Sequence, residues 1–163
     1  MRHRPATEQA ARNLLIDTAT SRLEADWQRL SPTPPPIAQY LTPPSDPARV
    51  PLLVALIPVD QEWRWRNGDR RLLEAYLEEF PELNANQSAL IELLSAECLT
   101  RASLAEIPSF RELRTRFSNV CEHVPLEQIR ERARRERLTR PWSKVLPKSP
   151  VRRRNLPTLV PQS

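Results

Sequence analysis

Apolar residues recur every three or four positions near the start of the chain, which is the spacing that places side chains on one side of a helix. They fall at Ala11, Leu14, Leu15, Ala19, Leu23, Trp27 and Leu30. We therefore predict an amphipathic helix over residues 1–30 with these side chains on one buried face. Pro32 ends it, because proline lacks an amide donor and its ring crowds the preceding turn.

A proline-rich segment, residues 31–36, follows the first helix. Fixed φ angles and missing amide donors favour an extended polyproline II connector there. Such a segment serves either as a stiff linker or as a ligand for an aromatic groove, and the sequence leaves both roles open.

The apolar run from Val50 to Ile57 has no polar side and indicates a buried element, but periodicity alone does not distinguish helix from strand. Pro58 predicts a kink or a break before the segment continues to Arg66. Gly68 follows as a natural terminator, since glycine readily adopts the left-handed conformation found after helix ends.

Three further helices are indicated downstream. The spacing predicts helices over Arg71–Phe80 and Asn86–Leu99. Ser109 and Glu112 have the spacing of a capping box, in which the serine hydroxyl and the glutamate satisfy amides at a helix start. We expect that third helix to end near Phe117.

Parts of this pattern repeat at offsets of 36 and 37 residues. A three-residue apolar step occurs at Ile37 with Tyr40, Leu73 with Tyr76, and Phe110 with Leu113. The offset of 37 also relates Leu53, Leu56, Asp60 and Arg64 to Leu90, Leu93, Glu97 and Arg101. We predict that residues 31–124 form a body of repeated short-helix/long-helix units. The predicted fold is therefore an all-α, small helical bundle of about six to seven helices.

Composition narrows the possible functions. The chain has one glycine, Gly68, and 18 prolines. Phosphate loops, dinucleotide fingerprints and nucleophile elbows each need several neighbouring glycines, so these sites are excluded. The cysteines, Cys98 and Cys121, lack metal-site spacing, and we expect Cys98 to be a buried thiol. We predict no metal, no cofactor and no enzymatic activity.

Charge is distributed unevenly along the chain. The net charge is +5. Residues 125–163 carry eleven basic side chains and three glutamates, a balance of +8, which leaves a balance of −3 for the rest. We predict a basic helix over residues 125–140, with arginines around nearly its whole circumference, and a disordered Pro/Arg-rich tail over residues 141–163. The candidate residues for binding phosphate or an acidic partner are Arg130, Arg132, Arg134, Arg135, Arg137, Arg140, Arg152, Arg153 and Arg154.

Tryptophan and arginine alternate in one short segment, at Trp63, Arg64, Trp65 and Arg66. Such groups can bind a partner through cation–π contacts. Residues two apart lie on different helix faces, so we expect one tryptophan in the core and the other partly exposed. These four residues are the candidate partner-binding site.

Four segments in a fixed order resemble the helical accessory region that precedes the catalytic domain in planctomycete-type Hanks serine/threonine kinases. These segments are 23–28 (LEADWQ), 36–41 (PIAQYL), 62–69 (EWRWRNGD) and 73–82 (LEAYLEEFPE). The resemblance covers residues 21–123, and Pro58 departs from it. The catalytic triplets of a kinase do not follow in this sequence. The resemblance implies an accessory region that occurs here without the kinase domain.

Together these features predict a non-catalytic helical protein-interaction or regulatory module that docks on a signalling protein or a larger assembly. Trp27, Trp63, Tyr76 and Phe80 would hold its scaffold. The alternative is a small nucleic-acid-associated protein that contacts phosphates through its basic C-terminal tail. The sequence has no apolar run long enough to span a bilayer, so we expect no membrane insertion and a cytoplasmic location.

Overall fold

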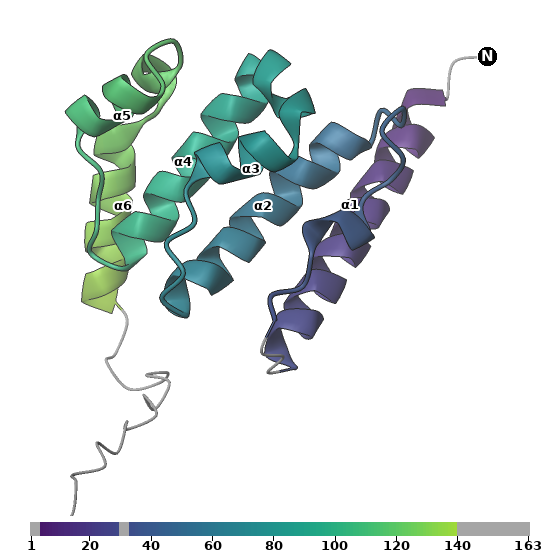
Figure 1. Cartoon of the computed structure of the whole chain (residues 1–163), viewed down its shortest axis with the longest axis horizontal. Coiled ribbons are helices and arrows are strands. Elements are labelled where there is room, and N and C mark those ends of the chain that lie inside the picture. Colours follow the sequence, from purple (N-terminus) through teal and green to yellow (C-terminus); the bar gives the residue numbers. More distant parts are fainter. Residues whose placement is uncertain (1–3, 30–32, 140–163) are drawn as a thin grey trace, which may run out of the picture.

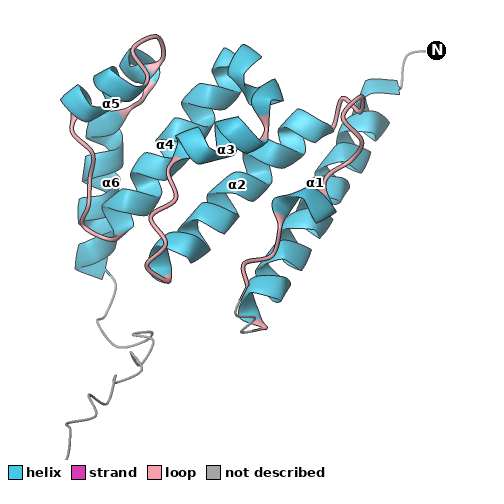
Figure 2. Ribbon diagram, viewed as in Figure 1, coloured by secondary structure: helices cyan, strands magenta, loops and turns pink. Residues whose placement is uncertain are grey.

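Helices form all the regular secondary structure of residues 4–29 and 33–139, the part of the chain that the computed structural model describes (Figure 2). The α-helices are α1 (Arg4–Gln28), α2 (Arg49–Arg66), α3 (Leu73–Glu79), α4 (Gln87–Ser103), α5 (Phe110–Arg116) and α6 (Leu126–Thr139). The short 3₁₀ helices are η1 (Ile37–Tyr40), η2 (Pro81–Ala85) and η3 (Cys121–His123). The predicted all-α bundle is confirmed. The predicted disordered tail over residues 141–163 lies outside the described residues.

The four longer helices α1, α2, α4 and α6 lie in a row (Figure 1). Each packs against the next one along the chain, and the shorter elements cross the row in the view of Figure 1. This arrangement corresponds to the repeated short-helix/long-helix unit, with η1 before α2, α3 before α4 and α5 before α6. Since each unit contacts its neighbours, the core is a continuous layer between consecutive long helices.

Pro58 lies inside α2, which continues unbroken from Arg49 to Arg66. Of the predicted kink or break, the break does not occur, and the apolar run before Pro58 is helical. A proline in a helix interior costs roughly 3 kcal/mol. Burial of a large aliphatic side chain contributes about 1.5–3 kcal/mol. Four large aliphatic side chains just before the proline are buried between α1 and α4: Leu52, Leu53, Leu56 and Ile57. Their burial outweighs the cost of the proline.

The predicted apolar face of α1 is correct only in its C-terminal half. Ala19 and Leu23 are buried, whereas Leu14 is 68% exposed and Leu15 is also exposed. The reason is geometric: each residue turns an α-helix by about 100°, so every step of four residues moves about 40° past a full turn. Two such steps place Leu15 about 80° away from Leu23. Leu14, the residue before Leu15, lies about 100° further around the helix and therefore opposite the face that contacts α2.

Three of the four aromatic residues assigned to the scaffold contact the interior, and the fourth, Trp63, is partly exposed. Tyr76 and Phe80 are buried, and Trp27 packs against the core. Cys98 is buried as predicted, and burial together with the neighbouring Glu97 raises the pKa of its thiol to about 12. A thiol with such a pKa remains protonated at neutral pH and is a packing group.

The ends of α2 and α4 have the same backbone geometry, 37 residues apart. After α2, Gly68 has a φ of 88°, and the Asp69 amide donates to the Arg64 carbonyl at 2.9 Å. After α4, Ala105 has a φ of 63°, and the Glu106 amide donates to the Arg101 carbonyl at 2.9 Å. Both ends are Schellman motifs. The second one places an alanine where glycine is favoured.

From these two helix ends we predict that exchanging glycine for alanine at one, and alanine for glycine at the other, changes the free energy of unfolding in opposite directions. Gly68→Ala should lower the free energy of unfolding by about 1 kcal/mol, because a β-carbon disfavours a positive φ. Ala105→Gly should raise it by about 0.5 kcal/mol, since relief of that strain exceeds the entropy that glycine adds to the unfolded chain. Urea unfolding of both variants checks this prediction. Two changes of the same sign would contradict it.

Candidate interaction surfaces

Asp60 is a fully buried carboxylate in the middle of α2. Its Oδ2 accepts hydrogen bonds from Arg64 Nε and from the Tyr76 hydroxyl, each at 2.7 Å. Arg64 also pairs with Asp69 at 2.7 Å. Burial and the Asp60 carboxylate raise the pKa of Tyr76, so its hydroxyl is a permanent donor. These bonds hold α3 and the end of α2 in fixed positions.

Glu97 takes the equivalent position in α4, 37 residues later, and is also fully buried. Its carboxylate accepts a hydrogen bond from the Leu73 amide at 2.8 Å and one from Arg116 at 2.6 Å. Arg116 also donates to both carboxylate oxygens of Glu74, from Nε and from one terminal nitrogen of its guanidinium. Burial lowers the pKa of Arg116, but the hydrogen bonds with Glu74 and Glu97 outweigh this effect and raise it. The network joins α3, α4 and α5.

The predicted capping box at the start of α5 forms in part. The Ser109 hydroxyl accepts a hydrogen bond from the Glu112 amide at 3.0 Å. The Glu112 carboxylate binds Arg101 of α4. The Arg101 hydrogen bond lowers the pKa of Glu112, although partial burial opposes this change. Glu112 therefore fixes α5 to α4 through its side chain.

The alternating Trp/Arg segment is divided between the interior and the surface. Trp65 is buried, and its indole nitrogen donates to the Arg71 carbonyl at 3.0 Å. Trp63 is partly exposed and stacks on Trp27, with ring centroids 6.2 Å apart and planes at 6°. The expected division of the two tryptophans is confirmed. Arg64 is held in the Asp60 network described above, and Arg66 pairs with Glu62 at the surface. The four residues do not form one surface.

One face of α6 packs against α4 through Leu126, Ile129 and Ala133. The predicted basic helix is confirmed, but the prediction that arginines surround nearly its whole circumference is wrong. The exposed face carries Arg132, Arg134 and Arg135.

Arg130 is partly exposed and pairs with Glu127 at 2.7 Å. Arg135 pairs with Glu131 at 2.9 Å. Nothing is described for the side chain of Arg137. The remaining candidates lie outside the described residues: Arg140, Arg152, Arg153 and Arg154.

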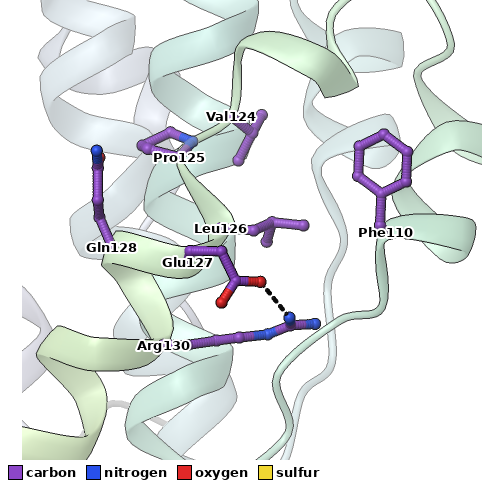
Figure 3. Close-up of a pocket in the computed structure, with 7 residues that line it drawn as sticks. All are labelled: Phe110, Val124, Pro125, Leu126, Glu127, Gln128 and Arg130. Carbon is purple, nitrogen blue, oxygen red and sulfur yellow. Dashed lines mark hydrogen bonds and ion pairs between the residues drawn. The ribbon is translucent and has the colours of Figure 1, made fainter.

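A cavity of about 350 Å³ lies between the start of α5 and the start of α6 (Figure 3). Phe110 borders it and is 45% exposed. The other lining residues are Val124, Pro125, Leu126, Glu127, Gln128 and Arg130. We call this cavity the Phe110 pocket. Phe110 is a repeat position in the sequence, but the pocket beside it was not predicted, because a repeat offset does not show which repeat positions are covered by other residues.

A second exposed surface runs along α1 on the side away from α2. Its exposed residues are mostly small or apolar: Ala11, Leu14, Thr18, Ser21 and Ala25. We call these five residues the α1 outer face. A shallow depression of about 430 Å³ lies on it, lined by Asp17, Thr18, Ser21, Arg22 and Ala25.

Comparison with protein-family models, with curated proteins and with solved structures finds no match to this chain. None of the helices within residues 4–29 and 33–139 has the length and apolar character that crossing a bilayer requires. The same residues contain no group of three or more His, Cys, Asp or Glu side chains placed to hold a metal ion. The resemblance to the kinase accessory region stays a prediction.

The Glu97 network predicts a large, site-specific loss of stability. Glu97→Gln removes a buried charge that balances Arg116, and it should lower the free energy of unfolding by about 3 kcal/mol. Glu92→Gln changes an exposed glutamate of the same helix and should shift it by less than about 0.5 kcal/mol. Denaturant unfolding of both variants measures the difference. Equal effects would show that the network contributes no more than a surface charge.

Proposed function

We propose that this chain is a non-catalytic protein-interaction module that binds an apolar segment of a partner protein in the Phe110 pocket. The partner would be a signalling protein or a larger assembly, and the role regulatory, as the resemblance to the bacterial kinase accessory region implies. The module would act in the cytoplasm. Both cysteines are buried free thiols, which suits a reducing compartment.

One observation carries this proposal. The repeat positions Ile37 and Leu73 are 3% and 0% exposed, whereas the equivalent residue Phe110 is 45% exposed. The inner units therefore cover an apolar side chain that the last described unit leaves at the surface, beside a cavity. Exposed aromatic groups next to an apolar cavity are typical of protein-binding sites.

The chemistry of the pocket indicates what it would bind. Val124 and Leu126 supply apolar walls, and the ion pair between Glu127 and Arg130 lies at one side (Figure 3). A large apolar side chain would fill the cavity, and polar groups beside it would meet the ion pair. A peptide with one bulky apolar residue flanked by polar residues fits this description.

A non-catalytic role is supported by the way the buried polar groups are used. Asp60 and Glu97 are held by arginines and by donors of the neighbouring short elements. Catalytic carboxylates need access to a substrate and a pKa matched to proton transfer. Here the buried carboxylates join helices, which is a structural task.

The pocket proposal predicts binding that depends on Phe110. Selection from a random peptide library should enrich sequences with a bulky apolar residue. Phe110→Ala should weaken binding of the enriched peptides by about 2 kcal/mol, or roughly thirtyfold, which is typical for removal of a central aromatic group. Fluorescence anisotropy measures the affinities.

Leu14→Ala provides the matched control for this experiment, because it removes another exposed apolar side chain at the opposite end of the row. Its peptide affinity should equal that of the wild-type chain. Failure to enrich any peptide, or equal loss in both variants, would exclude the Phe110 pocket as the binding site.

Phosphate binding by α6 is a second candidate function. The observation that favours it is the set of exposed arginines around the part of this helix that does not pack on α4, Arg132, Arg134 and Arg135. Exposed cations on a helix can contact nucleic-acid phosphates and bind them without sequence preference. This function would need no pocket.

Nucleic-acid binding by these arginines predicts a specific salt dependence. Replacing the three arginines together by glutamine should lower the slope of log affinity against log salt by roughly 2–3, since each contact to duplex DNA contributes about 0.9. Arg66→Gln on α2 is the control and should leave the slope unchanged. Titration of labelled duplex DNA at several salt concentrations gives the slopes, and an unchanged slope in the triple variant would rule out these arginines as the binding site.

A further inference from the structure

The α1 outer face has no neighbouring helix within the described part of the chain. α1 is the first helix of the row, and α2 covers only its opposite side (Figure 1). Leu14 therefore has 68% of its surface in contact with solvent. An apolar side chain in this position favours association with another surface.

The five residues of this face follow the spacing of a two-helix seam. They are separated by steps of three and four: Ala11, Leu14, Thr18, Ser21 and Ala25. These are the a and d positions of consecutive heptads. Most of them are small, so a partner helix could approach closely, and Leu14 would project into the partner. The seam thus fits a partner helix. The charged residues beside the seam indicate that this helix is α1 of a second copy of the chain.

The charges beside the seam are complementary to those of a second copy. In a parallel pair of helices, a residue just before the seam faces the residue five positions later on the partner. This relation joins Asp17 to Arg22 and Glu24 to Arg29 of the second copy. Each pair occurs twice by symmetry. All of these side chains are exposed in the single chain. Arg29 directly follows the end of α1 and pairs with Asp26 of its own chain at 2.8 Å, whereas Asp17 and Arg22 lie within the helix.

An antiparallel pair would lose this complementarity. Residues on the same flank then face each other across the seam, so Asp17 would lie near Glu24 of the second copy. Like charges in that arrangement repel. The charge pattern therefore selects the parallel orientation.

We propose that two copies of this chain associate through the α1 outer face as a parallel, two-fold symmetric dimer. The two rows of helices then extend in opposite directions from a central pair of α1 helices, and the Phe110 pocket of each copy remains at the far end. This proposal uses a different surface from the peptide site, so the two can fail independently.

Analytical ultracentrifugation of the full chain over a range of concentrations tests the association. The expected result is a monomer–dimer equilibrium. Leu14→Glu should raise the dissociation constant by at least about tenfold, because it places a charge in the seam. Since Leu14 is exposed in the single chain, this variant should retain its helical circular dichroism. A monomer at every concentration would overturn the proposal, and so would an unchanged dimer in Leu14→Glu.

A charge-exchange experiment tests the orientation. Asp17→Arg should weaken the dimer, and the double variant Asp17→Arg with Arg22→Asp should restore it, since the pairs are reformed with reversed sign. The Arg22 guanidinium also lies 5.8 Å from the Tyr40 ring centre, so thermal unfolding of each variant is measured first. Failure of the double variant to restore association, with folding intact, would overturn the parallel arrangement.

Oxidative cross-linking gives an independent readout. In the parallel seam Ser21 faces Ser21 of the second copy, so Ser21→Cys should form an intermolecular disulfide rapidly. Ser45→Cys is the matched control, because Ser45 is also exposed but is not part of the α1 outer face and lies in the segment between η1 and α2. The native cysteines are buried and should not contribute. Equal rates in the two variants would contradict the proposed interface.

Discussion

Asp60 and Glu97 are carboxylates in the interior of the protein, and the positions of the short helices depend on how these charges are paired. A buried charge without a partner is strongly destabilising. Each carboxylate therefore needs donors from the groups around it. Asp60 accepts from Arg64 of its own helix. The neighbouring short helices supply Tyr76 to Asp60, and Leu73 and Arg116 to Glu97. Apolar packing alone would allow these elements to slide, whereas the hydrogen bonds define one position. A buried, hydrogen-bonded carboxylate therefore occupies the same position in two successive units, although its donors differ.

A row built from such units has covered positions in its middle and open positions at its ends. The α1 outer face and the Phe110 pocket are these two open positions in the described part of the chain. Each exposes a large apolar side chain, Leu14 or Phe110, but they differ in shape: one is a long helical stripe, and the other is a small cavity with a single aromatic side chain at its border. The stripe suits a helix, and the cavity suits a short segment. The two ends of one architecture can therefore serve two different partners.

The sequence predicted the class of fold and the repeat, because periodic apolar spacing and the offset of 37 residues are local properties of the chain. It did not predict the course of α2 through Pro58, since the outcome depends on how much apolar surface the helix buries on both sides. It also placed Leu14 in the core, because counting short steps along the chain ignores the angle of about 100° that each residue turns around the helix. The two tryptophans were separated correctly from helix geometry alone. The Phe110 pocket was not found, because exposure at a repeat position depends on whether a further unit covers it.

The linear arrangement of units also has a dynamic consequence. In a row where each element is supported by its neighbours, amides of α2 and α4 should exchange with solvent mainly through large openings, while those of α1 and α6 exchange through fraying of one end. Binding of a partner at one end would then stabilise the adjacent helix most and each helix beyond it less. Energetic coupling between the two ends would therefore decrease with distance along the row. The two terminal surfaces would bind their partners almost independently of each other.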